Sequence, residues 1–113
     1  MSNDSDFLPL GVLQEQILVA VLRTREDAYG MNVRREIERV TDRSLAIGAV
    51  YATLDRLEEK GLLLSNRYTV DGTSRRMFEV TAEGARALAD TRAMRERLWS
   101  GVDMRRLMKL AGG

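Results

Sequence analysis

The sequence predicts a mainly α fold of the α+β winged-helix type, with a three-helix helix-turn-helix core, a two-stranded wing and a long C-terminal helix. Three observations lead to this prediction. Apolar residues recur at helical spacing in successive stretches up to Gly61. The spacing then becomes alternating on both sides of Asp71-Gly72, a dipeptide typical of hairpin turns. A further stretch with helical spacing follows Thr81, and threonine is a residue type that caps helices.

Length and charge are consistent with one domain. The 113 residues contain 44% apolar residues and a formal net charge of +1, which is typical of a folded chain. We expect a flexible N-terminus at 1–9, a winged helix-turn-helix domain at 10–81 and a C-terminal dimerisation helix at 82–113. Because the net charge is close to zero, binding to nucleic acid would need local basic clusters rather than a global field.

Composition argues against several function classes. The chain has no cysteine and no histidine, so it lacks thiolate metal ligands, the commonest imidazole ligand and the commonest general base. No paired motif suggests an enzyme based on carboxylates or lysine, and we expect no cofactor. No apolar run approaches the ~20 residues of a membrane span. Asp4 and Asp6 stand where a signal peptide would be basic, so we expect a cytoplasmic protein without a membrane partner.

Two helices are expected before the centre of the chain. The first, at about 11–23, has an apolar stripe formed by Leu10, Leu13, Ile17 and Val21. After a polar connection, the second helix covers 30–41, and its expected buried face consists of Val33, Ile37 and Val40. Two short helices joined by a few residues indicate a helix-turn-helix.

The stretch from Ile47 to Gly61 is the expected recognition helix. One face is apolar at i, i+3, i+4 and i+7, and Gly61 stands where a helix C-cap glycine is expected. The other face begins with small residues and continues with polar ones, so another surface could approach the backbone closely: Gly48, Ala49, Ala52, Thr53, Asp55 and Arg56. Such a helix suits the major groove. On this stretch alone, an ordinary amphipathic helix explains the pattern equally well.

The hairpin after Gly61 carries positive charge. Arg67 lies on the first strand, Thr73 and Ser74 continue the turn, and Arg75 and Arg76 begin the second strand. A wing of this kind can lie along phosphates or in the minor groove. The alternative is a solvated hairpin whose arginines bind nothing.

The C-terminal helix is expected from Ala82 to about Trp99, with a bend at Gly101 and a last short helix capped by Asp103. An apolar stripe remains without an obvious core to cover: Met94, Leu98, Trp99 and Val102. The stripe can anchor a homodimer interface. Alternatively, the indole of Trp99 can stack on a planar or cationic ligand.

Four signatures over roughly residues 10–84 resemble those of the PadR family, winged-helix transcription factors of bacteria that respond to phenolic acids. The recognition-helix and wing patterns of the family are G-T-L-Y-x-x-L-x-R-L-E and R-R-K-Y-Y-x-L-T-x-x-G. In this chain the four signatures are Tyr29-Gly30, Ile47-Gly48-Ala49-Val50-Tyr51 followed by Leu54 and Arg56-Leu57-Glu58, Lys60-Gly61-Leu62, and Ser74-Arg75-Arg76-Met77-Phe78-Glu79-Val80-Thr81 with Glu83-Gly84. Each is weak alone, and together in this order they are specific.

The resemblance implies a cytoplasmic homodimer that binds pseudo-palindromic double-stranded DNA, usually as a repressor. It also implies that the C-terminal helix supplies dimer contacts and that a small aromatic or cationic effector can bind between subunits. We expect DNA contacts from the helix at 47–60 and the wing at 67–76: Ile47, Gly48, Ala49, Tyr51, Ala52, Arg56, Arg67, Thr73, Ser74, Arg75 and Arg76. We expect the dimer contacts or effector site at Met94, Leu98, Trp99 and Val102.

The chain also departs from the family pattern. Ala46 replaces the usual Ser or Asn and cannot cap the recognition helix, so the cap either moves to Ser44 or is absent. Ala49 replaces a Thr, and Met77 and Phe78 replace two tyrosines, which removes three hydroxyl groups. These losses favour the alternative function, a winged-helix protein-interaction module without sequence-specific DNA binding.

Overall fold

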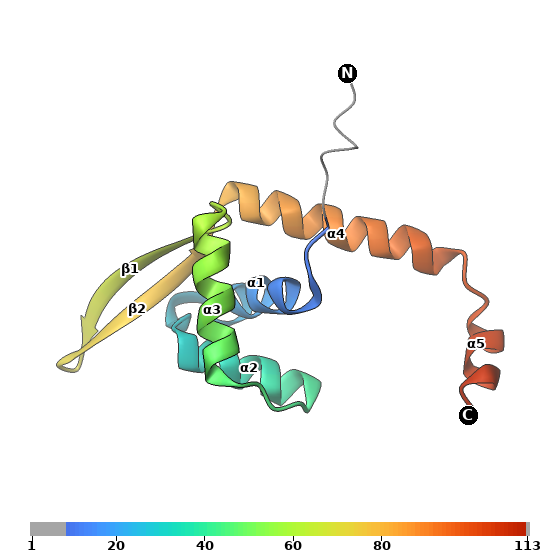
Figure 1. Cartoon of the computed structure of the whole chain (residues 1–113), viewed down its shortest axis with the longest axis horizontal. Coiled ribbons are helices and arrows are strands. Elements are labelled where there is room, and N and C mark those ends of the chain that lie inside the picture. The colour runs from blue at the N-terminus through green and yellow to red at the C-terminus, as the bar shows by residue number, and fades with distance from the viewer. Residues whose placement is uncertain (1–8, 113) are drawn as a thin grey trace, which may run out of the picture.

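The computed structural model describes residues 9–112. Three helices form the core: α1 (Val12–Thr24), α2 (Gly30–Thr41) and α3 (Ile47–Glu59), with a short 3-10 turn η2 (Arg25–Asp27) after α1. The wing consists of β1 (Leu63–Val70) and β2 (Thr73–Val80), and α4 (Ala82–Ser100) and α5 (Met104–Leu110) follow. Figure 1 shows the wing on one side of α3 and α4 extending past the other side of the core. The predicted winged-helix fold is therefore confirmed.

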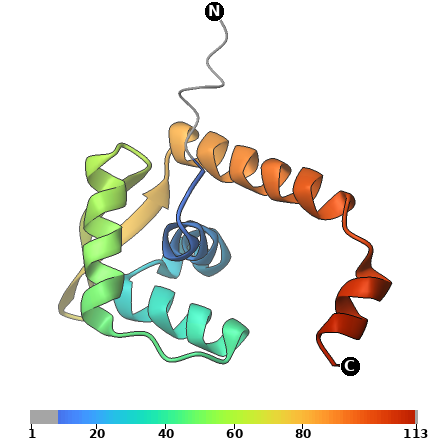
Figure 2. The ribbon, with the colours of Figure 1, turned by 45° about the vertical axis from the view of Figure 1, so that its right-hand side comes forward.

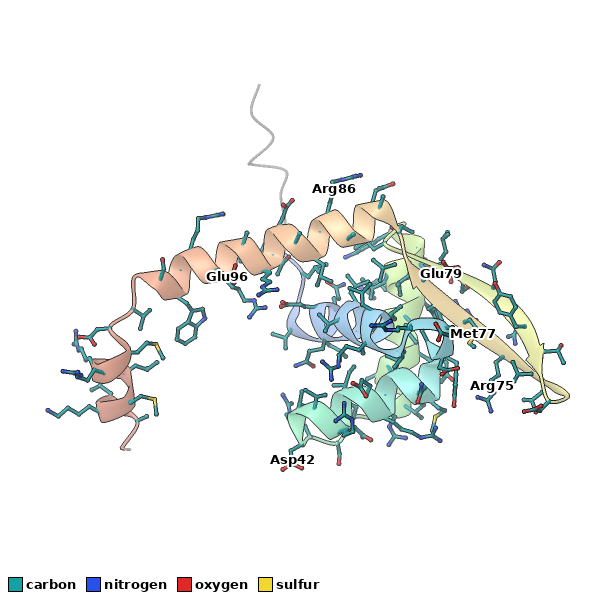
Figure 3. The ribbon with its side chains drawn as sticks, turned by 180° about the vertical axis from the view of Figure 1, so that it is seen from behind. Asp42, Arg75, Met77, Glu79, Arg86 and Glu96 are labelled. Carbon is teal, nitrogen blue, oxygen red and sulfur yellow. The ribbon has the colours of Figure 1, made fainter. Side chains whose placement is uncertain are left out.

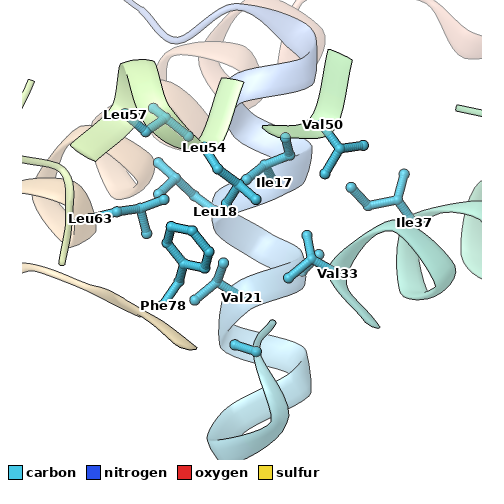
Figure 4. Packing of buried hydrophobic residues seen from close by; sticks show 12 residues of the cluster. Ile17, Leu18, Val21, Val33, Ile37, Val50, Leu54, Leu57, Leu63 and Phe78 are labelled. Carbon is cyan, nitrogen blue, oxygen red and sulfur yellow. The ribbon is translucent and has the colours of Figure 1, made fainter. Parts of the chain in front are cut away.

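One hydrophobic core joins the three helices to the base of the wing (Figure 4). Ile17 and Leu18 of α1 lie at its centre, among apolar residues from α2, α3 and both strands. The fully buried side chains from those elements are Val33, Val50, Leu54, Leu57, Leu63 and Phe78. Val40, which the periodicity places on the buried face of α2, is instead half exposed, because it lies at the end of α2 beyond the core.

The wing is an antiparallel hairpin whose register pairs Leu63 with Val80 and Val70 with Thr73. Asp71 and Gly72 both have positive φ, at 51° and 76°, as a two-residue hairpin turn requires. The backbone N–H of Phe78 also donates to the carbonyl oxygen of Ala28 at 2.9 Å. The base of the wing is therefore attached to the segment that precedes α2.

The helix ends follow the capping residues. Thr81 accepts a hydrogen bond from the backbone N–H of Gly84 at 2.9 Å, and Asp103 accepts one from that of Arg106 at 3.1 Å. Gly61 has a φ of 77° directly after the end of α3, the left-handed conformation that ends many helices. The predicted N-caps Thr81 and Asp103 are confirmed, and so is the predicted glycine at the C-terminal end of α3.

The C-terminal part of the chain extends away from the core. The middle of α4 contacts α1 and the segment before it: the backbone N–H of Leu10 donates to the Thr91 hydroxyl at 3.1 Å, and Arg95 pairs with Glu15. After Gly101 the chain turns, and α5 lies clear of the three-helix core (Figure 2).

Candidate nucleic-acid interface

The start of α3 is open to an approaching surface. A Cβ atom built on Gly48 would meet no atom within 4 Å, and Ala49, Ala52 and Arg56 are all exposed. Ile47, by contrast, is half-buried and packs against the core. The side of α3 expected to face DNA therefore carries only short side chains over its first turns.

No side chain caps α3, which confirms that the cap is absent rather than moved to Ser44. Two side chains of α2 hold the preceding backbone instead. Glu38 accepts from the backbone N–H of Leu45 at 2.7 Å, and Arg34 donates to the Leu45 carbonyl oxygen at 2.8 Å. The positions of both residues on α2 give no sign in the sequence of a contact with a later loop.

Tyr51 lies between α3 and the start of α2. A Cβ atom on Gly30 would lie 2.4 Å from Cε1 of the Tyr51 ring, so only glycine leaves space for the ring there. The Tyr51 side chain is nevertheless 38% exposed. Its ring thus packs on α2 while part of it stays accessible.

An open hollow of about 580 Å³ lies where α2, α3 and the wing meet. Its lining is basic and aromatic: Tyr29, Gly30, Met31, Arg35, Tyr51, Arg67, Ser74, Arg75 and Arg76. Within residues 9–112, Arg35, Arg67 and Arg75 take part in no ion pair. Three guanidinium groups without a carboxylate partner around one hollow attract an anion, such as a phosphate of the DNA backbone.

Arg75 and Arg76 are adjacent in sequence but differ in their surroundings. The Arg75 guanidinium lies 4.2 Å from the centre of the Tyr29 ring, a cation–π contact that leaves it without a carboxylate partner. Figure 3 labels Arg75 beside the wing. Arg76 instead forms ion pairs with two carboxylates of α3, Asp55 and Glu58. The sequence predicted DNA contacts for both arginines, because two neighbouring residues of one type give no sign that they have different partners in the fold.

The pairing of Arg76 affects the acid–base properties of its partners. Hydrogen bonds from the Ser65 hydroxyl and then from Arg76 lower the pKa of Glu58 from its ordinary value of 4.5. Partial burial opposes the charge of Arg76, but its bonds to Asp55 and Glu58 outweigh this effect, so the pKa of Arg76 is raised. Both groups are charged at neutral pH.

The residues expected at a dimer or effector site lie apart from this interface. Leu98 and Trp99 are 69% and 52% exposed on the distal half of α4, and Val102 is 41% exposed after the helix. Met94 is half-buried closer to the core.

Thr73 lies at the exposed wing tip, so it is near the other proposed DNA contacts.

A family model described as "Transcriptional regulator PadR-like family" matches residues 17–90, from within α1 to the first half of α4. The chain belongs to the PadR-like family. This membership makes it a DNA-binding transcriptional regulator and not an enzyme.

Relatives with names or structures agree with the PadR-like assignment. Transcriptional regulator Rv3488 of Mycobacterium tuberculosis is 38% identical over 72 residues, which are 64% of this chain and 66% of that protein, just under two thirds of its length. The hsRosR-S4 complex, from H. salinarum, has a TM-score of 0.65 at 26% identity and covers 97% of this chain and 91% of that one.

A PadR-family transcriptional regulator from Eggerthella lenta has a TM-score of 0.63 at 26% identity, with 75% of each chain covered. PadR-type regulators bind DNA and typically act as dimers. Within the described residues, no helix of this PadR-like chain is long and apolar enough to cross a membrane.

Proposed function

We propose that the chain is a repressor that acts on cytoplasmic DNA, binding a pseudo-palindromic operator as a homodimer. The observation that carries the proposal is the hollow between α2, α3 and the wing, with its three unpaired arginines beside the small-residue face of α3. In this arrangement the start of α3 enters the major groove, while Arg67 and Arg75 contact flanking phosphates. Arg35, which the sequence analysis did not select, joins them from α2.

The remaining predicted contacts have secondary roles in this proposal. Ala49, Ala52 and Arg56 present the exposed face of α3, and Ile47 supports its first turn from the core side. The accessible part of the Tyr51 side chain lines the same hollow as Arg67 and Arg75. Thr73 and Ser74 extend the contact along the wing.

Salt dependence of DNA binding tests this proposal. Duplexes enriched by the protein from a random-sequence library serve as the probe. Arg75→Ala should weaken binding to every sequence and reduce the slope of log K against log salt by about one unit for each phosphate that is no longer bound, because fewer counterions are released. Glu79→Ala on the same strand is a matched control that should leave the slope unchanged. An unchanged slope for Arg75→Ala would remove the wing from the interface.

The proposal of dimerisation through α4 is supported by the exposed continuation of a buried face of this helix. Thr91 is buried against the N-terminal segment, and Leu98 lies about two turns further along the same side of α4, yet it is exposed. A second copy would cover this side, including Trp99 and Val102. Two recognition helices should then lie about 34–36 Å apart, matching half-sites one DNA turn apart.

A small aromatic or cationic effector is proposed to bind beside Trp99 between the two subunits. The exposed indole of Trp99 can stack on a planar or cationic compound held between the two subunits. Because Trp99 is the only tryptophan, quenching of its fluorescence reports binding directly. Quenching by a compound that leaves DNA affinity unchanged would contradict an effector role.

The protein-interaction alternative rested on the missing cap of α3 and on the three lost hydroxyl groups at Ala49, Met77 and Phe78. Arg34 and Glu38 hold the backbone before α3 in place of a cap, which weakens the first of these two arguments. The alternative predicts that no duplex is enriched from the random library, whereas the repressor proposal predicts a palindromic consensus.

A further inference from the structure

Arg76 is the most fully bonded arginine at the junction of the wing and α3. Its Nε donates to the Ser65 hydroxyl oxygen at 3.1 Å, one Nη donates to Asp55 at 2.8 Å, and the other donates to Glu58. The Ser65 hydroxyl in turn donates to the second oxygen of Glu58 at 2.8 Å. We call these four residues, Asp55, Glu58, Ser65 and Arg76, the wing clamp.

The wing clamp adds a polar connection between three elements whose apolar side chains already meet in the core. Asp55 and Glu58 are one turn apart on α3, Ser65 is on β1, and Arg76 is on β2. The planar fork of a guanidinium fixes direction as well as distance when several of its nitrogen atoms are bonded. Arg76 therefore constrains the direction of the wing relative to α3 beyond the core contacts at its base.

The hydrophobic core fixes the position of the fork. The Arg76 guanidinium lies 4.7 Å from the centre of the Phe78 ring, and Phe78 is fully buried. The Arg76 side chain is only 28% exposed. A guanidinium stacked on a core ring and bonded on three nitrogens has little freedom to reach outward.

The charges of the clamp also argue against a phosphate contact. Two carboxylates surround one guanidinium, so the clamp carries a net negative charge. It offers a phosphate no electrostatic attraction, in contrast to the uncompensated guanidinium of the adjacent Arg75.

We propose that Arg76 is a positioning residue, which sets the angle of the wing on the recognition helix and does not itself bind DNA. The clamp holds the wing where Arg67 and Arg75 can reach the backbone while α3 lies in the groove. This role in DNA binding rests on the proposed function, whereas the mechanical role of the clamp does not.

The mechanical role is tested in the protein without DNA. Val70 lies near the wing tip and is 42% exposed. Since the chain has no cysteine, the variant Val70→Cys takes a single nitroxide label at this position. Broadening of the α3 amide signals then reports the distance of the wing tip from each turn of α3. Arg76→Met and Arg76→Lys should both change this profile, and Arg75→Met should leave it unchanged. An unchanged profile in both Arg76 variants would overturn the proposal.

DNA binding supplies the second test, with duplexes enriched by the wild-type protein. Arg76→Lys keeps the charge but loses the fork, so it should weaken binding on the order of tenfold at an unchanged salt slope. Arg75→Lys should keep most of the affinity, since lysine also binds phosphate. Wild-type affinity in Arg76→Lys, together with a reduced slope in Arg76→Met, would show a phosphate contact and overturn the proposal.

A third variant separates positioning from charge screening. Arg76→Met combined with Asp55→Asn and Glu58→Gln removes the whole charged set, so repulsion between the α3 carboxylates and DNA cannot account for its behaviour. This variant should remain weaker than wild type, and full recovery would mean that Arg76 only screens the carboxylates. If no duplex is enriched at all, the proposed binding of a specific operator fails, while the label profile still decides whether the clamp positions the wing.

Discussion

Glycine positions show how single residues control the distance between surfaces in this molecule. A Cβ added to Gly48 would meet no neighbour, one added to Gly30 would overlap the side-chain ring of Tyr51, and one added to Gly84 would overlap the backbone carbonyl oxygen of Leu62. The three positions therefore differ in what an added methyl group would displace: solvent, a side chain or the main chain.

Gly48→Ala should separate stability from DNA binding. Alanine is the better helix former, so the free energy of unfolding should rise by about 0.5–1 kcal/mol, less if the first turn is frayed. The same methyl group lies on the proposed groove-facing side and should weaken DNA binding. Urea unfolding and a binding titration on one preparation check both effects. A variant that is more stable and binds DNA as well as wild type would show that α3 does not approach DNA at Gly48.

Gly30→Ala and Gly84→Ala should differ in cost. In Gly30→Ala the Tyr51 ring can rotate away, so we expect a loss of about 1–3 kcal/mol that is largely absent when Tyr51 is also changed to Ala. Gly84→Ala requires the Leu62 backbone to move, so its cost should be larger and should not respond to Tyr51→Ala. Urea unfolding of the single and double variants measures the coupling, and additive losses at Gly30 and Tyr51 would contradict the steric explanation.

At the scale of secondary-structure elements, charged side chains join the wing to α3 in addition to the core contacts. Glu58 is bonded to both Ser65 and Arg76, and these bonds lower its pKa from 4.5. A carboxyl group whose pKa is lowered on folding stabilises the native state above its unfolded pKa. That contribution is lost as the pH falls through the native pKa.

The junction should therefore weaken in acid. We expect the wild-type free energy of unfolding to fall as the pH drops from 6 to below about 4.5, and Glu58→Gln to lose part of this dependence. Urea unfolding followed by circular dichroism at several pH values measures both curves. Glu96→Gln, at an exposed pair on α4, is the matched control and should follow the wild-type curve. Identical curves for wild type and Glu58→Gln would show that the clamp does not contribute to acid sensitivity.

At the scale of the whole molecule, the chain has a compact winged domain and an extended arm formed by α4 and α5 (Figure 1). The arm exposes its largest apolar side chains: Leu98, Trp99, Val102, Met104, Met108 and Leu110. A stripe of this kind on a soluble surface marks an interaction site. The proposed partner is a second copy of the chain.

Leu98→Asp should convert the dimer to a monomer, because the carboxylate would be buried without a partner in the interface. Sedimentation velocity at micromolar concentration reports the mass, and circular dichroism confirms that the winged domain stays folded. Ala89→Asp, on the opposite and exposed side of α4, is the matched control and should remain dimeric. A wild-type monomer, or a dimer in Leu98→Asp, would rule out this interface.

Local sequence patterns determined the elements of this protein. Apolar periodicity, the Asp71-Gly72 turn and the capping residues Thr81 and Asp103 act between residues close in the chain, so the sequence alone located the helices, the wing and the small-residue face of α3. The same patterns did not show which arginine is free, because Arg76 finds Asp55 and Glu58 only after the wing folds back on α3.

Tertiary structure alone decided the roles of Arg34, Glu38 and Gly30 as well. Each acts on a residue in a different element, and such contacts depend on how the elements pack rather than on spacing within one element. Arg75 and Arg76 illustrate the physical reason. Electrostatic pairing depends on distance in space, and adjacent residues on one strand point to opposite faces and therefore meet different neighbours.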